Sequence, residues 1–448
     1  MTISEERFEF TSRAKRNLAI LVVVGIVLLL IGIFSNMGGS GHGHEEHAVL
    51  QTSTSSQLVA FNGSEGEHAA AAEHHETATW LKRLYVDLWI NNVFFTGLGI
   101  IGLFFVAIQY ASQAHWSTGF LRVPTAMANW LPIAAVLMIL VFLIGKHDLF
   151  HWTHSSLYNG LEPDKVLLGK SSYFFFPMEA GSFPFFWMAR MIIFFGVWLV
   201  FFYYMKKRIF AEDSEAPGVS RWKQIRSSSA WFLVFFAVSS SISAWDWVMS
   251  IDPHWFSTLF GWYVFSSWWV AGLALISLIV IVLKENGYLS IVNENHLHDL
   301  GKFVFGFTVF WTYLWFSQFL LIYYANIPEE SVYFIQRLTT GQYRPVFFIN
   351  LFVNFVFPFL FLMTRDSKRK LPTMKIAAVV VIAGHWLDFY LMVTPGTMKF
   401  DGGFGFMEIG TTLIYLGAFL WITLSNLSKH LLIPKNHPTL EESLHHHI

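Results

Sequence analysis

Long apolar segments alternate with short polar ones along almost the whole chain. The first covers 17–34, after a polar start, 1–16, that ends in Arg13, Lys15 and Arg16. Nine more follow, and each is long enough for a helix to cross the roughly 30 Å hydrocarbon core of a bilayer. They cover about 88–111, 127–145, 184–205, 229–249, 259–283, 303–325, 346–363, 375–394 and 407–427. The pattern predicts an all-α polytopic membrane protein with about ten transmembrane helices.

Two polar stretches interrupt or follow this pattern. The insert 35–86 is rich in His, Glu, Ala, Ser and Gly, a composition typical of segments that stay solvated. Its first part contains six histidines: His42, His44, His47, His68, His74 and His75. The tail 428–448 follows the last apolar segment. No small-residue cleavage site follows 17–34, so we expect a retained first helix rather than a signal peptide.

Composition narrows the possible functions. The chain is 54% hydrophobic and 13% charged, with a mean hydropathy of +0.48, which supports the membrane assignment. Its net charge of −1 gives no basic surface for nucleic acid. It contains no cysteine, which excludes disulfides, cysteine-ligated iron–sulfur clusters and c-type haem attachment within this chain. Redox centres of those kinds must therefore belong to partners.

The distribution of Lys and Arg predicts the orientation. If the N-terminus is cytoplasmic, the cytoplasmic segments hold 20 of the 29 basic residues, with six in the loop 206–228 alone. Positive loops stay on the cytoplasmic side of bacterial membranes. We therefore expect an inner-membrane protein with both termini in the cytoplasm. The histidine-rich insert, the loop 146–183 and the turn 250–258 then face the periplasm.

The stretch 243–269 carries the strongest candidate chemistry. Asp246, Asp252 and His254 lie there at the predicted outer end of two helices, among six tryptophans. Charged groups in the aromatic belt of a membrane are costly unless they are paired or functional. The segment GKHDLFHWTH, 145–154, has a similar pattern and adds His147 and Asp148.

Other ionisable residues interrupt the apolar segments. We predict that they lie in the middle or outer half of the bilayer: Asp87, Arg190, His385, Asp388 and Glu408. Neutral polar groups are predicted to line the inner half: Ser239, Ser240, Ser241, Ser243, Thr308, Gln318, Asn350 and Asn354. The predicted asymmetry suggests proton handling on the outer side. The alternative for the neutral groups is packing between helices.

Pairing is expected within this set. His385 and Asp388 are three residues apart, so they share a helix face, and a carboxylate beside an imidazole suits proton transfer. Arg190 is the natural counter-charge for one carboxylate. The alternatives are a static ion pair for Asp246 and a static hydrogen bond for His385 and Asp388. His147, His151 and His154 would share a face, but without a further ligand we predict no metal site.

The motifs AWDWVMSIDPHWFSTLFGWYVFSSWW, GHWLDFYLMVTP and GKHDLFHWTH resemble the membrane subunits of alternative complex III, a bacterial quinol:cytochrome c oxidoreductase. The chain resembles the second, ActF-type, of its two NrfD-like (polysulfide-reductase membrane subunit) chains. The resemblance covers nearly all of 80–430. It implies two four-helix bundles, here 87–249 and 250–394, between a first helix at 17–34 and a last one within 395–427.

The resemblance also implies the partners. They are a sister NrfD-like subunit, a periplasmic iron–sulfur subunit, cytochrome c subunits with haem c, and in some systems a terminal oxidase. In the family the quinol site lies at the outer side of a bundle, where His147, Asp148, Asp246, Asp252 and His254 are expected here. The resemblance favours the sister subunit for the working site, which leaves proton conduction or scaffolding for this chain.

Three functions therefore remain open from the sequence. The first is a subunit without redox cofactors that supports quinol oxidation, proton transfer toward the periplasm, or both. The second is a purely structural subunit of the same complex. The third is an independent secondary transporter, for which midplane helix breaks are expected and few are present.

Overall fold

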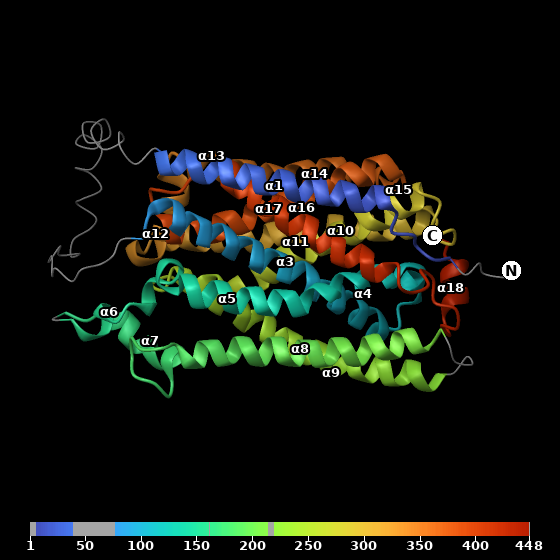
Figure 1. Cartoon of the computed structure of the whole chain (residues 1–448), viewed down its shortest axis with the longest axis horizontal. Helices are drawn as coiled ribbons and strands as arrows, with labels where there is room; N and C mark the ends of the chain where they lie inside the picture. The colour runs from blue at the N-terminus through green and yellow to red at the C-terminus, as the bar shows by residue number, and fades with distance from the viewer. Residues whose placement is uncertain (1–5, 39–76, 161, 214–218, 448) are drawn as a thin grey trace.

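The computed structural model describes residues 6–38, 77–160, 162–213 and 219–447, and over these ranges it confirms the all-α prediction. Apart from one isolated bridge between Arg7 and Leu431, the described chain is helical or irregular. Residues 39–76, with the six histidines of the insert, lie outside the described ranges. Figure 1 shows long, roughly parallel helices with short helices at both ends.

Ten apolar helical segments of the described chain are long enough to cross a membrane, which makes this a multi-pass membrane protein. Six are single helices: α1 (Ser12–Gly38), α3 (Thr79–Ser112), α8 (Phe185–Ala211), α9 (Val219–Trp247), α10 (Phe260–Glu285) and α11 (Glu294–Ala325). Two more are α16 (Leu371–Met398) and α17 (Phe406–Leu427). Two are composite: α4 (Arg122–Met127), η3 (Ala128–Trp130) and α5 (Leu131–Leu149), and then α13 (Tyr343–Leu351), η6 (Phe352–Val356) and α14 (Phe357–Phe361).

Short helices mark the two ends of the bundle (Figure 1). One end, here called the α12 end, carries α6 (Ser156–Asn159), α7 (Lys165–Phe175) and α12 (Pro328–Thr339). The other, the α18 end, carries α15 (Arg365–Arg369) and α18 (Leu440–Leu444). The Arg7–Leu431 bridge brings both terminal segments to the α18 end. The short 3-10 helices η2 (His115–Phe120), η4 (His151–Thr153) and η5 (Met249–Ile251) complete the set.

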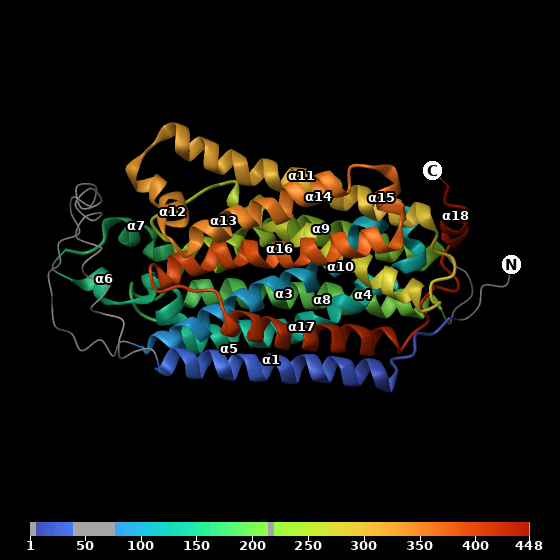
Figure 2. The same cartoon turned by 90° about the horizontal axis from the view of Figure 1, so that it is seen from above.

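Helices α3 and α10 form the centre of the bundle. They contact each other; α3 also packs on α5, α9, α16 and α17, and α10 on α9, α11 and α16. The approach is close because glycine faces large side chains: a Cβ on Gly97 would lie 1.9 Å from the Trp268 ring. Helix α1 lies at the edge on α17, where Gly25 meets Gly410. Figure 2 shows α11 leaving the bundle toward the α12 end.

The predicted helix ends are wrong where charged side chains are paired. Helix α3 begins at Thr79 rather than near 88, because Arg83 pairs with Glu408 of α17 and the helix continues through it. The third span begins at Arg122 rather than near 127, because Arg122 pairs with Asp213. A charge that is paired inside the protein does not mark the membrane boundary.

Candidate functional site

Asp388 is the most deeply placed carboxylate of the candidate site. It is fully buried on α16 and accepts four hydrogen bonds from three other helices. Asn350 (3.1 Å) and Tyr263 donate to Oδ1, whereas Ser267 (3.0 Å) and Trp311 (2.9 Å) donate to Oδ2. An ionised carboxylate only accepts hydrogen bonds, so this shell suits the charged form. Neutral donors therefore hold the negative charge, with no cation among the four contacts.

His385 lies one turn before Asp388, and the two side chains are joined through Ser267. The Ser267 hydroxyl donates to Asp388 and lies 3.0 Å from Nδ1 of His385. A hydroxyl has one proton, so Nδ1 must donate to it. The other nitrogen, Nε2, is buried without a partner among the described residues. The predicted pair is thus connected by a serine that the sequence analysis did not single out.

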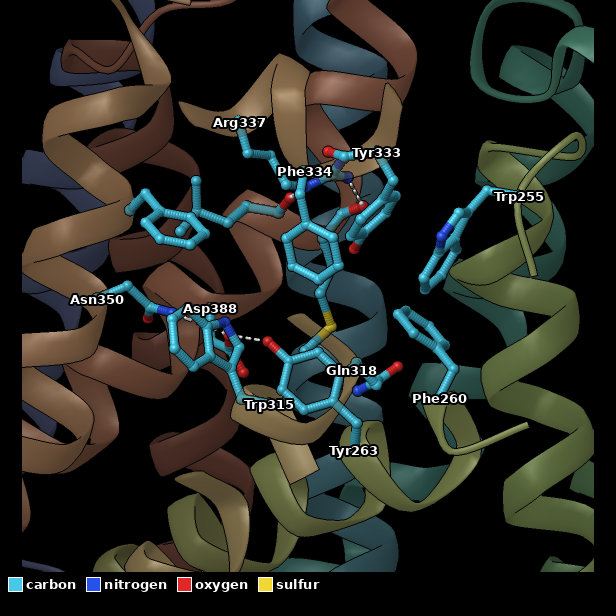
Figure 3. Close-up of a pocket in the computed structure, with 13 residues that line it drawn as sticks. Trp255, Phe260, Tyr263, Trp315, Gln318, Tyr333, Phe334, Arg337, Asn350 and Asp388 are labelled. Carbon is cyan, nitrogen blue, oxygen red and sulfur yellow. Dashed lines mark hydrogen bonds between the residues drawn. The ribbon is translucent and has the colours of Figure 1, made fainter. Parts of the chain in front are cut away.

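A small cavity of about 20 Å³ lies beside Asp388 (Figure 3). Its walls are mainly aromatic, and its polar lining comes from Gln318, Asn350, Asp388, Arg337 and the Tyr263 hydroxyl. In Figure 3, Arg337 and Tyr333 lie above the Asp388–Tyr263 hydrogen bond. Trp255 stacks on Tyr333 with ring centres 4.0 Å apart. A cavity of this size has room for about one water molecule, which would lie beside Asp388 and Tyr263.

Arg337 is a functional candidate that the sequence analysis missed. It lies on α12, is 2% exposed, and donates to the carbonyls of Leu391 (2.9 Å) and Tyr333 (2.7 Å). Its closest carboxylate contact is with Asp252, at 3.4 Å. The sequence pattern of 328–339 has a helical period, which places Arg337 on the same helix face as Tyr333. This pattern could have identified Arg337 as a candidate.

Asparagines extend the polar network from Asp388 along the eighth span. Asn354 donates to the side-chain oxygen of Asn350 at 2.7 Å, and Asn350 in turn donates to Asp388. Asn354 lies in the π-turn η6, a feature frequent at functional sites. Gly384 of α16 leaves room for it, because a Cβ there would lie 2.4 Å from the Asn354 oxygen.

Asp246 belongs to a separate, tightly paired site. Arg190 binds both of its carboxylate oxygens, at 2.7 and 2.8 Å, and also donates to the Tyr173 carbonyl. The predicted counter-charge role of Arg190 is confirmed. Both residues are buried and form a bidentate ion pair. Separating them would leave an unpaired charge inside the protein, which is strongly unfavourable.

Glu408 forms a second ion pair of the same kind. Arg83 binds it at 2.6 and 2.8 Å, and the Gly405 amide donates to it at 2.7 Å. Asp87 lies near enough to interact with both charges, and its Oδ2 is buried without a partner among the described residues. Two carboxylates therefore lie near one guanidinium, and Glu408 is the one that forms the ion pair. Arg83 had no role in the sequence analysis.

The remaining predicted residues lie at the α12 end and do not line the cavity. His254 is exposed and lies 2.6 Å from Asp164. Burial on its own raises the pKa of Asp164, but amide donors of α7 and His254 lower it below its ordinary value. Nδ1 of His147 contacts the Thr153 hydroxyl at 3.1 Å, and Asp148 follows it on α5. The rings of His147 and His151 approach His154, but the described residues contain no metal-binding group of three or more His, Asp or Glu.

The predicted asymmetry of charge is wrong. The α18 end also buries ionisable groups: Arg122 paired with Asp213, Glu212, His296 and Asp299. Moreover Gln318 and Asn350, both predicted for the inner half, line the cavity beside Asp388. The ionisable residues of the α18 end lie outside the predicted apolar segments 127–145, 184–205 and 303–325, so they were not counted among the ionisable groups inside the bilayer. What distinguishes Asp388 is its shell of neutral donors beside a cavity.

Comparison with models of protein families gave no match, and comparison with curated proteins gave none. Only this geometry and the motif resemblance therefore bear on the function of the chain.

Proposed function

We propose that the chain is an integral membrane subunit, without redox cofactors of its own, of a bacterial respiratory quinol:cytochrome c or quinol:terminal oxidase system. In this proposal it takes up protons released by quinol oxidation and passes them toward the periplasm. The observation that carries the proposal is Asp388: a buried carboxylate held by neutral donors beside an aromatic cavity. The resemblance of its motif GHWLDFYLMVTP to alternative complex III supplies the reaction class.

The orientation is part of the proposal. The excess of Lys and Arg at the α18 end favours a cytoplasmic α18 end and a periplasmic α12 end in the bacterial inner membrane. A sister NrfD-like subunit, a periplasmic iron–sulfur subunit and cytochrome c subunits would then supply the redox centres. The cavity beside Asp388 would lie in the periplasmic half of the membrane, where a quinol could deliver its protons.

The Tyr263 hydroxyl provides the first step of a proton path. Tyr263 lines the cavity and donates to Asp388, so a proton released by quinol could reach Tyr263 through a water in the cavity while the tyrosine proton moves to the carboxylate. Asp388 already has four donors, which makes it a weak base. Protonation thus requires one donor to turn away, and Tyr263 and Ser267 can do so by rotation of a hydroxyl. The proposed exit is toward Asp252 beside Arg337.

Replacement of Asp388 in the assembled complex tests this proposal. Asp388→Asn and Tyr263→Phe keep the shape of the site but remove the proton acceptor and the relay hydroxyl. In complexes purified with all subunits and reconstituted in liposomes, we expect quinol turnover or coupled proton release to fall by about 100-fold for Asp388→Asn. The control is Glu285→Gln, a partly exposed carboxylate at the opposite end of α10 from Tyr263.

A structural role in the same complex is the second candidate, and the two-pronged Arg190–Asp246 and Arg83–Glu408 pairs favour it. Such pairs fix helix positions without exchanging protons. Normal turnover and proton release by an intact Asp388→Asn complex would reject the relay and leave the structural role. Purification without any haem- or iron–sulfur-containing chain would reject both.

A further inference from the structure

A groove at the α12 end has room for a ligand. It encloses about 460 Å³ between α7 and the turn that follows α9, which is within the range of roughly 300–1,000 Å³ typical of ligand pockets. The cavity beside Asp388 holds only about 20 Å³. Trp255 lines both spaces, so the two are neighbours. The groove has no part in the proposed proton path and requires its own explanation.

The walls of the groove are mainly aromatic and apolar. They include Tyr173, Phe174, Trp245, Met249 and Phe256. Phe256 is 59% exposed. Gly169 of α7 also lines the groove, and a Cβ added there would meet no atom within 4 Å. The described side chains therefore leave this space open, and its walls suit an apolar ligand.

Lys170 is the one charged residue among the described residues that line the groove. Its ammonium donates to the Pro253 carbonyl at 2.6 Å and lies 5.7 Å from the centre of the Phe256 ring. Asp164 is close enough to interact with Lys170, but its carboxylate binds His254 at 2.6 Å. An ammonium has three N–H donors, so two remain for an anionic group. The groove thus combines apolar walls with one cation.

An exposed apolar stripe on α9 leads to the groove. Trp231, Val234 and Val238 are 70%, 65% and 60% exposed, and Trp245 of the groove wall follows Val238 after two helical turns. Spacings of three, four and seven residues place these four side chains on one helix face. The stripe belongs to a membrane-spanning helix, so it connects the apolar interior of the bilayer with the groove.

We propose that this groove binds an anionic phospholipid of the leaflet at the α12 end, with an acyl chain against its aromatic walls and the headgroup at Lys170. A lysine beside apolar surface near the end of a membrane helix keeps its stem in contact with that surface and its charge at headgroup level. A neutral quinol would use the walls but not the ammonium, and free phosphate would use the ammonium but not the walls. The site is independent of the proposed respiratory role.

Lipid binding by the purified full-length chain tests the role of the charge. Detergent-washed protein is titrated with phosphatidylglycerol or phosphatidylcholine, and bound lipid is counted by native mass spectrometry. We expect one tightly retained phosphatidylglycerol, weaker retention of phosphatidylcholine, and about fivefold weaker binding of phosphatidylglycerol by Lys170→Gln. Lys165→Gln is the matched control, because Lys165 is exposed on the same helix and does not line the groove.

Filling the groove tests the role of its volume. Gly169→Leu places a side chain in the open space, and leucine favours a helix more than glycine does, so α7 should fold and the retained phosphatidylglycerol should be lost. Gly196→Leu on α8 is the control, because its Cβ position is equally open and lies outside the groove.

Equal retention of phosphatidylglycerol by Gly169→Leu and Gly196→Leu, or by Lys170→Gln and Lys165→Gln, would overturn the proposal. So would equal retention of phosphatidylcholine, or displacement of the lipid by a neutral quinone analogue. The Lys170→Gln comparison suffices if Gly169→Leu misfolds.

Discussion

At the scale of single residues, the buried carboxylates fall into two kinds. Asp246 and Glu408 are each bound by an arginine through two hydrogen bonds. Protonating either would leave a buried guanidinium without its partner, at a cost of about 3–5 kcal/mol. Asp388 is held only by neutral donors, two of which are rotatable hydroxyls. Protonation there requires a rotation rather than the loss of an ion pair, so Asp388 is the better proton acceptor.

Glu212 is a third kind, because both of its carboxylate oxygens are buried without a hydrogen-bond partner among the described residues. Burial raises the pKa of Glu212 to about 7, against the opposing effect of Arg122. Between pH 4.5 and 7 the unfolded chain releases this proton while the folded chain keeps it. Stability therefore falls as the pH rises through this window.

The variant Glu212→Gln removes this proton and should remove that part of the pH dependence. Relative to the variant, we expect the wild type to lose up to about 3 kcal/mol between pH 4.5 and 8. Thermal unfolding midpoints in detergent across this range provide the measurement, with the exposed Glu179→Gln as control. Parallel pH profiles for wild type and Glu212→Gln would contradict the assignment.

At the scale of helices, hydropathy was sufficient to find all ten spans, because each must bury about 20 residues in lipid whatever its neighbours are. The site could be predicted only in part. His385 and Asp388 were visible as ionisable residues inside an apolar segment. Tyr263 and Trp311 were not, because they are 125 and 77 residues away from Asp388 and ordinary in a membrane helix. They donate to Asp388 only because α10 and α11 pack against α16 in the folded protein.

The α3–α10 contact gives a test of this packing. A Cβ at Gly97 would lie 1.9 Å from Trp268, a fully buried ring that stacks on Phe389, next to Asp388. We expect Gly97→Ala to displace the indole and to lower stability by about 1–3 kcal/mol. On α8, Gly196 has no atoms within 4 Å of its Cβ position, so Gly196→Ala should be neutral or stabilise by up to about 1 kcal/mol. The thermal unfolding midpoints of Gly97→Ala and Gly196→Ala provide the measurement. Equal midpoints would show that the α3–α10 interface accommodates the added methyl group without loss of stability.

At the scale of the whole molecule, the two ends differ in architecture. The α12 end has a cover of short helices, and one of them, α12, places Arg337 beside the cavity. The α18 end has the paired terminal segments and the buried Arg122–Asp213 ion pair. The proposed orientation assigns the α12 end to the periplasm and the α18 end to the cytoplasm, because the loops richest in Lys and Arg lie at the α18 end.

The orientation itself can be measured because the chain contains no cysteine. Single cysteines introduced at two exposed positions, Glu179→Cys at the α12 end and Lys207→Cys toward the α18 end, report which side each occupies. In intact spheroplasts we expect a membrane-impermeant maleimide to label Glu179→Cys, and to label Lys207→Cys only after permeabilisation, because the loop 206–228 carries six basic residues. The cysteine-free chain is the background control. The opposite labelling would place Asp388 and its cavity in the cytoplasmic half of the membrane, and proton release from that site toward the periplasm would then require a path across the whole bundle.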